Sequence, residues 1–97
     1  MRHFIVTLTF EVPFESFGDA VARHRAFLDG GYSSGLLLMS GPRAPRTGGI
    51  VLARAASMEE LRAFFANDPY KLEGLATHDF VEFSPVKSQP FLADWVA

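Results

Sequence analysis

The sequence predicts an α+β domain whose strands and helices follow one another in the order βαββαβ. Three observations carry this prediction. An alternating apolar strand opens the chain, two helical patterns follow later, and glycine or proline separates most elements from the next. Because 48% of the 97 residues are hydrophobic, we expect one domain over residues 1–97 with a packed core.

The first two elements are a strand and a helix. Residues 3–11 alternate between apolar side chains on one face and mostly polar side chains on the other, and Pro13 ends this strand. The helix is predicted over residues 15–29. Gly30 and Gly31 are its expected C-terminal stop, because glycine adopts the left-handed conformation at little cost.

The later elements complete a sheet. Residues 35–40 and 50–54 are the predicted second and third strands, and residues 78–83 form a last strand. Ser57 opens the second helix with the capping box S-M-E-E, and that helix ends near residues 67–68, before a proline. This order is ferredoxin-like: a four-stranded antiparallel sheet with two helices on one face.

The face of the sheet that the helices leave uncovered also carries apolar residues. In the second strand Leu36 and Leu38 are expected on one face, and Leu37 and Met39 on the other. An exposed apolar face of this kind usually marks an interface. We therefore expect a homodimer, or a higher oligomer, that packs sheet against sheet.

The C-terminal tail, residues 85–97, is unusually aromatic for a segment that contains two prolines. Phe91 and Trp95 would leave a large apolar area in water if this tail were loose. We expect the tail to dock on the domain or on a partner subunit.

Composition excludes several classes of function. A net charge of −2 and the absence of cysteine argue against nucleic acid, an anionic membrane surface, disulfides and thiolate chemistry, and favour a cytoplasmic protein. RNA-recognition domains share the βαββαβ order, but they expose aromatic residues on their central strands. The third strand here, within GIVLARA, has none. We expect neither a nucleic-acid nor a membrane partner.

His24 is the candidate for chemistry on the first helix. It lies in the stretch VARHRAFLDGG, and its neighbours on the same helical face are apolar: Phe17, Val21, Phe27 and Leu28. An imidazole can both take and return protons near neutral pH. The alternative interpretation is a core histidine held by a structural hydrogen bond.

The three histidines do not indicate a metal site. His3, His24 and His78 lie on three different elements and lack the short spacing of typical ligand sets. No glycine-rich phosphate loop precedes a helix either. We therefore expect no metal and no cofactor.

Two segments are candidates for lining a substrate cleft. They are the turn after the second strand and the residue after Pro69, which together contribute Ser40, Gly41, Pro42, Arg43 and Tyr70. The planar fork of Arg43, like that of Arg46, would suit a carboxylate. The alternative is an ordinary turn with two solvated arginines.

Several short motifs together resemble the YciI-like (YCII-related) family of dimeric α+β barrel proteins. They are His24, the run GLLLMSGP at residues 35–42, Gly48-Gly49, and the sequence SMEELRAFFANDPY at residues 57–70. The resemblance covers nearly the whole chain. It implies a ferredoxin-like subunit that dimerises through its sheet, and a cleft holding a histidine and an aspartate, which by position are His24 and Asp68.

Asp68 would need a hydrogen-bond donor, because a carboxylate at the C-terminal end of a helix is unfavourable against the helix dipole. Paired with His24, it would hold the imidazole in one tautomer. We therefore expect a small cofactor-independent enzyme of the lyase or isomerase type, which transfers a proton on a small ring or carboxylated metabolite. The alternative is a non-catalytic module that binds a small ligand or serves as an accessory dimer.

Overall fold

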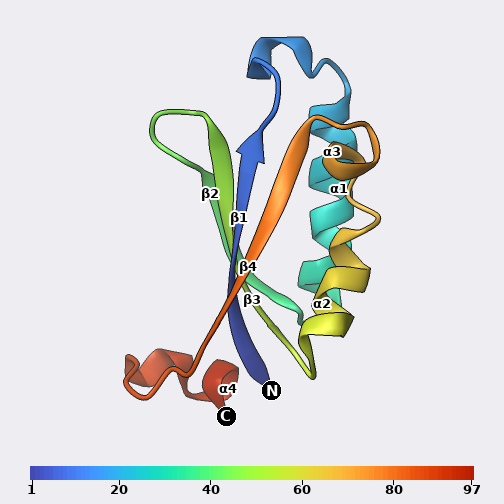
Figure 1. Cartoon of the computed structure of the whole chain (residues 1–97). Helices are drawn as coiled ribbons and strands as arrows, with labels where there is room; N and C mark the ends of the chain where they lie inside the picture. The colour runs from blue at the N-terminus through green and yellow to red at the C-terminus, as the bar shows by residue number, and fades with distance from the viewer.

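The computed structural model describes residues 1–97 and confirms the ferredoxin-like order of elements (Figure 1). The elements are β1 (Arg2–Phe10), α1 (Ala20–Ser33), β2 (Leu37–Pro42), β3 (Gly48–Ala55), α2 (Met58–Phe65), α3 (Pro69–Leu72), β4 (Ala76–Phe83) and α4 (Ala93–Val96). Short 3-10 turns lie at Phe14–Ser16 and Pro90–Leu92. None of these helices combines the length and the hydrophobicity that a membrane-spanning helix requires.

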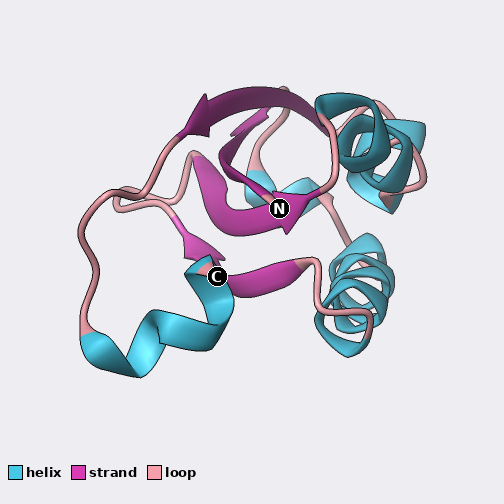
Figure 2. Cartoon of the chain, turned by 90° about the horizontal axis from the view of Figure 1, so that it is seen from below, coloured by secondary structure: helices cyan, strands magenta, loops and turns pink.

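The sheet has four antiparallel strands in the order β2-β3-β1-β4, so that β1 lies in the middle between β3 and β4. Helices α1, α2 and α3 lie on one side of this sheet, and the tail with α4 lies on the other (Figures 1 and 2). The core fills the space between sheet and helices. Its largest fully buried apolar side chains are Phe4 and Val6 of β1 and Leu61 and Phe65 of α2.

The first helix begins and ends later than the sequence predicts. The predicted range was 15–29, whereas α1 starts at Ala20, after the 3-10 turn and Gly18, whose φ is +57°. The predicted stop at Gly30 and Gly31 was wrong, because both glycines lie inside α1.

Gly31 has a packing role instead. A Cβ atom at this position would come within 2.7 Å of the side chains of Leu37 and Phe64. The missing side chain lets the last turn of α1 approach β2 and α2 closely. Gly35, with a φ of +84°, supplies the left-handed residue between helix and strand.

The strand predictions were correct in number, and their bounds differ by a few residues. Predicted strands at 35–40, 50–54 and 78–83 correspond to β2, β3 and β4. In β2 a bulge between Leu37 and Met39 shifts the register, so that Leu37 pairs with Ala53 and Met39 pairs with Leu52. The expectation that Leu37 and Met39 share a face was wrong. Leu37 is buried, whereas Met39 is 55% exposed.

The second helix starts as predicted. The Ser57 Oγ accepts a hydrogen bond from the backbone N–H of Glu60 at 3.1 Å. A complete capping box also needs the Glu60 side chain to accept a hydrogen bond from the backbone N–H of Ser57. That second bond is absent, so only half of the predicted capping box forms. The helix ends at Phe65, and Asp68 lies in the turn that follows it.

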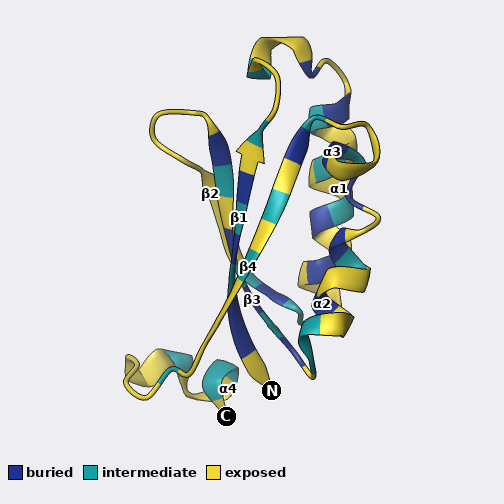
Figure 3. Cartoon of the chain, in the orientation of Figure 1, coloured by how far each residue is buried: buried dark blue, intermediate teal, exposed yellow.

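The sheet face opposite the helices exposes large apolar side chains. Figure 3 colours the exposed residues of the strands yellow, whether apolar or polar. Met39, Ile50, Val81 and Phe83 are each at least 43% exposed. Ile5 lies between Val81 and Leu52 on the neighbouring strands, which extends this apolar surface across the sheet.

The tail covers one end of the same face. The Trp95 ring lies 4.2 Å from the guanidinium carbon of Arg54 and 6.1 Å from the His3 ring. Arg54 also donates hydrogen bonds to the carbonyl groups of Asp94 and Trp95. Phe91, by contrast, is 82% exposed and makes no comparable contact within the chain.

We expect Val81→Asp to convert a homodimer into a monomer, because a charge would then lie on the apolar sheet face, beside Ile5. Light scattering coupled to size-exclusion chromatography measures the mass directly. Leu72→Asp is the matched control, since Leu72 is 69% exposed but lies on α3, away from this face. A monomer mass for the unmodified chain would contradict the prediction.

Candidate functional site

His24 and Asp68 come together beneath the first helix. The Nδ1 atom of His24, on α1, lies 2.7 Å from the Oδ1 atom of Asp68, which follows α2. The His24 side chain is 11% exposed and the Asp68 side chain is fully buried. The two residues, 44 positions apart in the chain, therefore form the contact that the family resemblance implies.

Asp68 is held by its own turn as well. Its backbone has an extended conformation, and its Oδ1 atom accepts a hydrogen bond from the N–H of Tyr70 at 3.0 Å, so that Asp68 is the N-cap of α3. The expected conflict with a helix dipole was therefore wrong. The carboxylate lies at the start of a helical turn, where a negative charge is favourable.

His78 is a third member of the cluster, and sequence reasoning missed it. Its Nε2 atom lies 2.9 Å from the Oδ2 atom of Asp68, and its side chain is 1% exposed. The alternation of residues along β4 puts the side chains of His78 and Asp79 on opposite faces of the sheet, but by itself it does not decide which of the two faces the helices. Ala76 and Phe80 lie two positions away on either side and so share a face with His78. Because both are apolar and pack toward the core, they indicate that His78 faces the helices.

These contacts determine the ionisation of Asp68. Burial alone would raise the pKa of this carboxyl group, but the hydrogen bonds from His24 and His78, the positive charge of His24 and the N–H of Tyr70 outweigh it. The net effect lowers the pKa of Asp68 to about 2. Asp68 is consequently a carboxylate at neutral pH.

An ionised Asp68 can only accept hydrogen bonds, so it fixes the protons of both imidazoles. Nδ1 of His24 and Nε2 of His78 must each carry the proton that they donate to Asp68. In neutral His24 the remaining nitrogen, Nε2, is then a free base. It has no hydrogen-bond partner in the chain and is not buried.

Tyr70 fixes the orientation of the His24 ring. The two rings are stacked, with centroids 3.8 Å apart and planes within 7° of parallel. Burial, and then the charge of Asp68, raise the pKa of the Tyr70 phenol, although Arg25 and Arg46 oppose this change. The phenol is therefore protonated at neutral pH.

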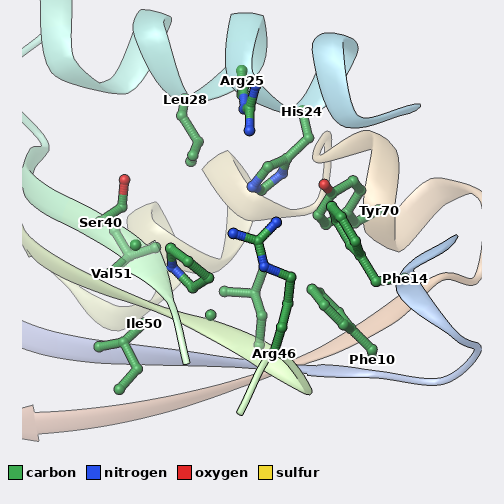
Figure 4. A pocket seen from close by; sticks show the side chains of 15 residues that line it. Phe10, Phe14, His24, Arg25, Leu28, Ser40, Arg46, Ile50, Val51 and Tyr70 are labelled. Atoms are coloured by element: carbon green, nitrogen blue, oxygen red, sulfur yellow. The ribbon is translucent and has the colours of Figure 1, made fainter. Parts of the chain in front are cut away.

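The free side of His24 faces a cavity of about 230 Å³ between α1 and the ends of β1, β2 and β3 (Figure 4). Among the predicted substrate-binding residues, Ser40, Gly41, Pro42 and Tyr70 line this cavity. The Ser40 hydroxyl is also 2.6 Å from that of Tyr32. The sequence thus located much of the cavity wall.

Arg43 does not line the cavity, so its predicted position in the cleft was wrong. Its backbone N–H pairs with the carbonyl of Gly48 at the base of the β2–β3 loop. Arg46, three residues later, lines the cavity instead, together with Arg25 of α1. Arg25 directly follows His24 and so lies beside the apolar face of α1, yet its long side chain reaches the cavity mouth from the flank.

No group of three or more His, Cys, Asp or Glu residues is arranged to hold a metal ion. In the cluster described here the two imidazoles bind separate oxygen atoms of Asp68, through 2.7 Å and 2.9 Å contacts, and so do not converge on a shared point. The arrangement is that of a hydrogen-bonded base and its orienting carboxylate.

Comparisons with known proteins agree with this fold. The family model of the YCII-related domain matches residues 1–84. The solved structure of 5-chloro-2-hydroxyhydroquinone dehydrochlorinase (TftG) from Burkholderia phenoliruptrix, in complex with 2,5-dihydroxybenzoquinone, is similar at a TM-score of 0.67. It shares 21% sequence identity, over 82% of this chain and 92% of that one.

A second similar structure is SnoaB, a cofactor-independent oxygenase from Streptomyces nogalater, at a TM-score of 0.53 and 16% identity. The match covers 92% of this chain and 96% of that one. A search of the curated proteins gives no match. At these identities the two structures establish the fold that this chain shares with them.

The low pKa of Asp68 predicts a loss of stability in acid. Because the folded-state pKa of about 2 lies below the unfolded value, ionised Asp68 stabilises the fold above about pH 4, and this stabilisation disappears as the pH falls toward 2. We expect the free energy of unfolding to fall by about 2 kcal/mol over this range. Urea denaturation at several pH values measures it.

Asp68→Asn should be less stable at pH 7 and should lack much of this acid dependence. Asp79→Asn is the matched control, because Asp79 is the exposed carboxylate next to His78 on the other face of β4. Parallel pH profiles for the unmodified chain and Asp68→Asn would show that Asp68 is not the group responsible.

Proposed function

Because this chain belongs to the YCII-related family, we propose that it is a small cofactor-independent enzyme in which His24 transfers a proton to and from a small ring compound. One observation carries the proposal. The Nε2 atom of His24 opens into a cavity while its Nδ1 atom is held by a buried carboxylate. This is the geometry of a general base that is oriented from behind.

The chemistry follows from the two protonation states of the imidazole. Nε2 of His24 takes a proton from a carbon or hydroxyl group of the substrate, and ionised Asp68 stabilises the imidazolium that forms. Return of the proton to another atom completes an isomerisation. Departure of a leaving group with its bonding electrons, followed by release of the imidazolium proton to water, completes an elimination.

The two proteins of similar fold support an enzyme of this kind. TftG is described as a dehydrochlorinase, and loss of hydrogen chloride is an elimination. SnoaB is described as an oxygenase that acts without a cofactor. A cavity of about 230 Å³ with aromatic walls is suited to a ligand of one ring.

The substitution His24→Asn removes the basic nitrogen of His24 but keeps its hydrogen bond to Asp68. The amide nitrogen of asparagine lies close to the place of Nδ1 and can still donate to Asp68, but nothing remains at Nε2 to accept a proton. We expect the rate of proton transfer to fall by about 100-fold or more. We expect the change in unfolding free energy to stay within about 1 kcal/mol.

Turnover is measured in D₂O with a panel of lactones, halogenated hydroquinones and keto acids, by following deuterium incorporation and halide release by NMR. His3→Asn is the control, since His3 is the imidazole outside the Asp68 cluster, beside Trp95. Equal turnover by His24→Asn and the unmodified chain would contradict the proposal. Binding of panel members without any turnover would favour the non-catalytic ligand-binding alternative.

A further inference from the structure

Two arginines at the mouth of the cavity have no acidic partner, and these unpaired positive charges indicate a negatively charged ligand. We propose that Arg25 and Arg46 form a carboxylate-binding site, and that the ligand presented to His24 is a single planar ring bearing a carboxylate. This inference rests on the proposed function, because it names the substrate class of the same cavity.

Arg46 is held over the cavity by its loop and by an aromatic ring. Its guanidinium carbon lies 4.9 Å from the centroid of Phe14, in a cation–π contact that leaves the N–H groups free. The loop is fixed next to it, because the carbonyl of Thr47 accepts a hydrogen bond from the N–H of Phe10 at 2.9 Å. In Figure 4 the guanidinium of Arg46 points from this loop toward His24.

Arg25 approaches the same space from α1. Its side chain extends into the cavity beside His24 and faces Arg46 across it (Figure 4). Neither arginine takes part in an ion pair, whereas Arg23 on the same helix binds Asp19 and Glu73. Helix α1 thus directs one arginine to acidic partners on the outside and leaves another unpaired at the cavity.

The charge at the cavity is opposite to that of the chain. The whole chain has a net charge of −2, yet the cavity wall contains two arginines and no aspartate or glutamate. The buried carboxylate behind it, Asp68, is already bound by His24 and His78. An anion placed between the arginines would therefore meet two unpaired positive charges and no acidic side chain in the cavity wall.

The shape of the cavity favours an aromatic or similarly flat carboxylate over a compact inorganic anion. Phe10, Phe14 and Tyr70 line the end next to His24, and Gly48 and Gly49 line another part. A planar guanidinium binds a carboxylate through two parallel hydrogen bonds, which also orients the ring attached to it. A ring held in this way would lie between the arginines and the Nε2 atom of His24.

Calorimetric titration with 2,5-dihydroxybenzoate and with its neutral counterpart 2,5-dihydroxybenzamide tests the proposal. We expect the benzoate to bind at least about tenfold more tightly than the benzamide. Arg46→Gln should weaken the benzoate by about tenfold or more and leave the benzamide nearly unchanged. Arg43→Gln is the control, because it removes the same charge from the same loop outside the cavity.

Equal affinities for benzoate and benzamide would overturn the proposal, and so would absence of benzoate binding or an equal effect of Arg43→Gln and Arg46→Gln. Circular dichroism shows that each variant is folded. The readout does not depend on turnover. Arginine-dependent binding without catalysis would reject the enzyme and keep the carboxylate site. Catalysis together with equal affinities for benzoate and benzamide would keep the enzyme and reject the carboxylate site.

Discussion

Three hydrogen bonds to the buried carboxylate of Asp68 connect the parts of the structure on which the site depends. They come from His24 on α1, His78 on β4 and the backbone of Tyr70 at the start of α3. A buried charge without such partners would be strongly unfavourable, so the three elements must keep their relative positions for Asp68 to stay ionised. The protonation of the candidate base, His24, therefore depends on the packing of the helices against the sheet.

Two neighbouring contacts help to hold His24 and α1 in position relative to Asp68. The Tyr70 ring stacks on His24 and limits its rotation. On the outer surface, Arg23 binds Glu73 through both carboxylate oxygens, at 2.8 and 2.7 Å, which ties α1 to the end of α3. Exposed ion pairs add little stability individually, but this one holds Arg23, the neighbour of His24 on α1. The cavity is thus lined by the imidazole of His24 on the inside and by the unpaired Arg25 and Arg46 at its mouth.

The sequence was sufficient for the order of elements, because alternation and helical periodicity reflect burial directly. The pairing of His24 with Asp68 came from the family resemblance. Local patterns could not reveal the bulge at Leu37–Met39, the closely packed Gly31, or the face on which His78 lies, since each depends on a neighbouring element. The choice between Arg43 and Arg46 depends in the same way on the path of a loop.

The protonation of the two imidazoles tests the central role of Asp68 most directly. Two-bond ¹⁵N–¹H NMR correlation spectra of histidine side chains at neutral or mildly alkaline pH distinguish the Nδ1–H from the Nε2–H tautomer. An ionised Asp68 requires the Nδ1–H form for His24 and the Nε2–H form for His78, because these are the atoms facing its oxygens. An Nε2–H tautomer for neutral His24 would contradict the account, because the nitrogen that faces the cavity would then not be a base.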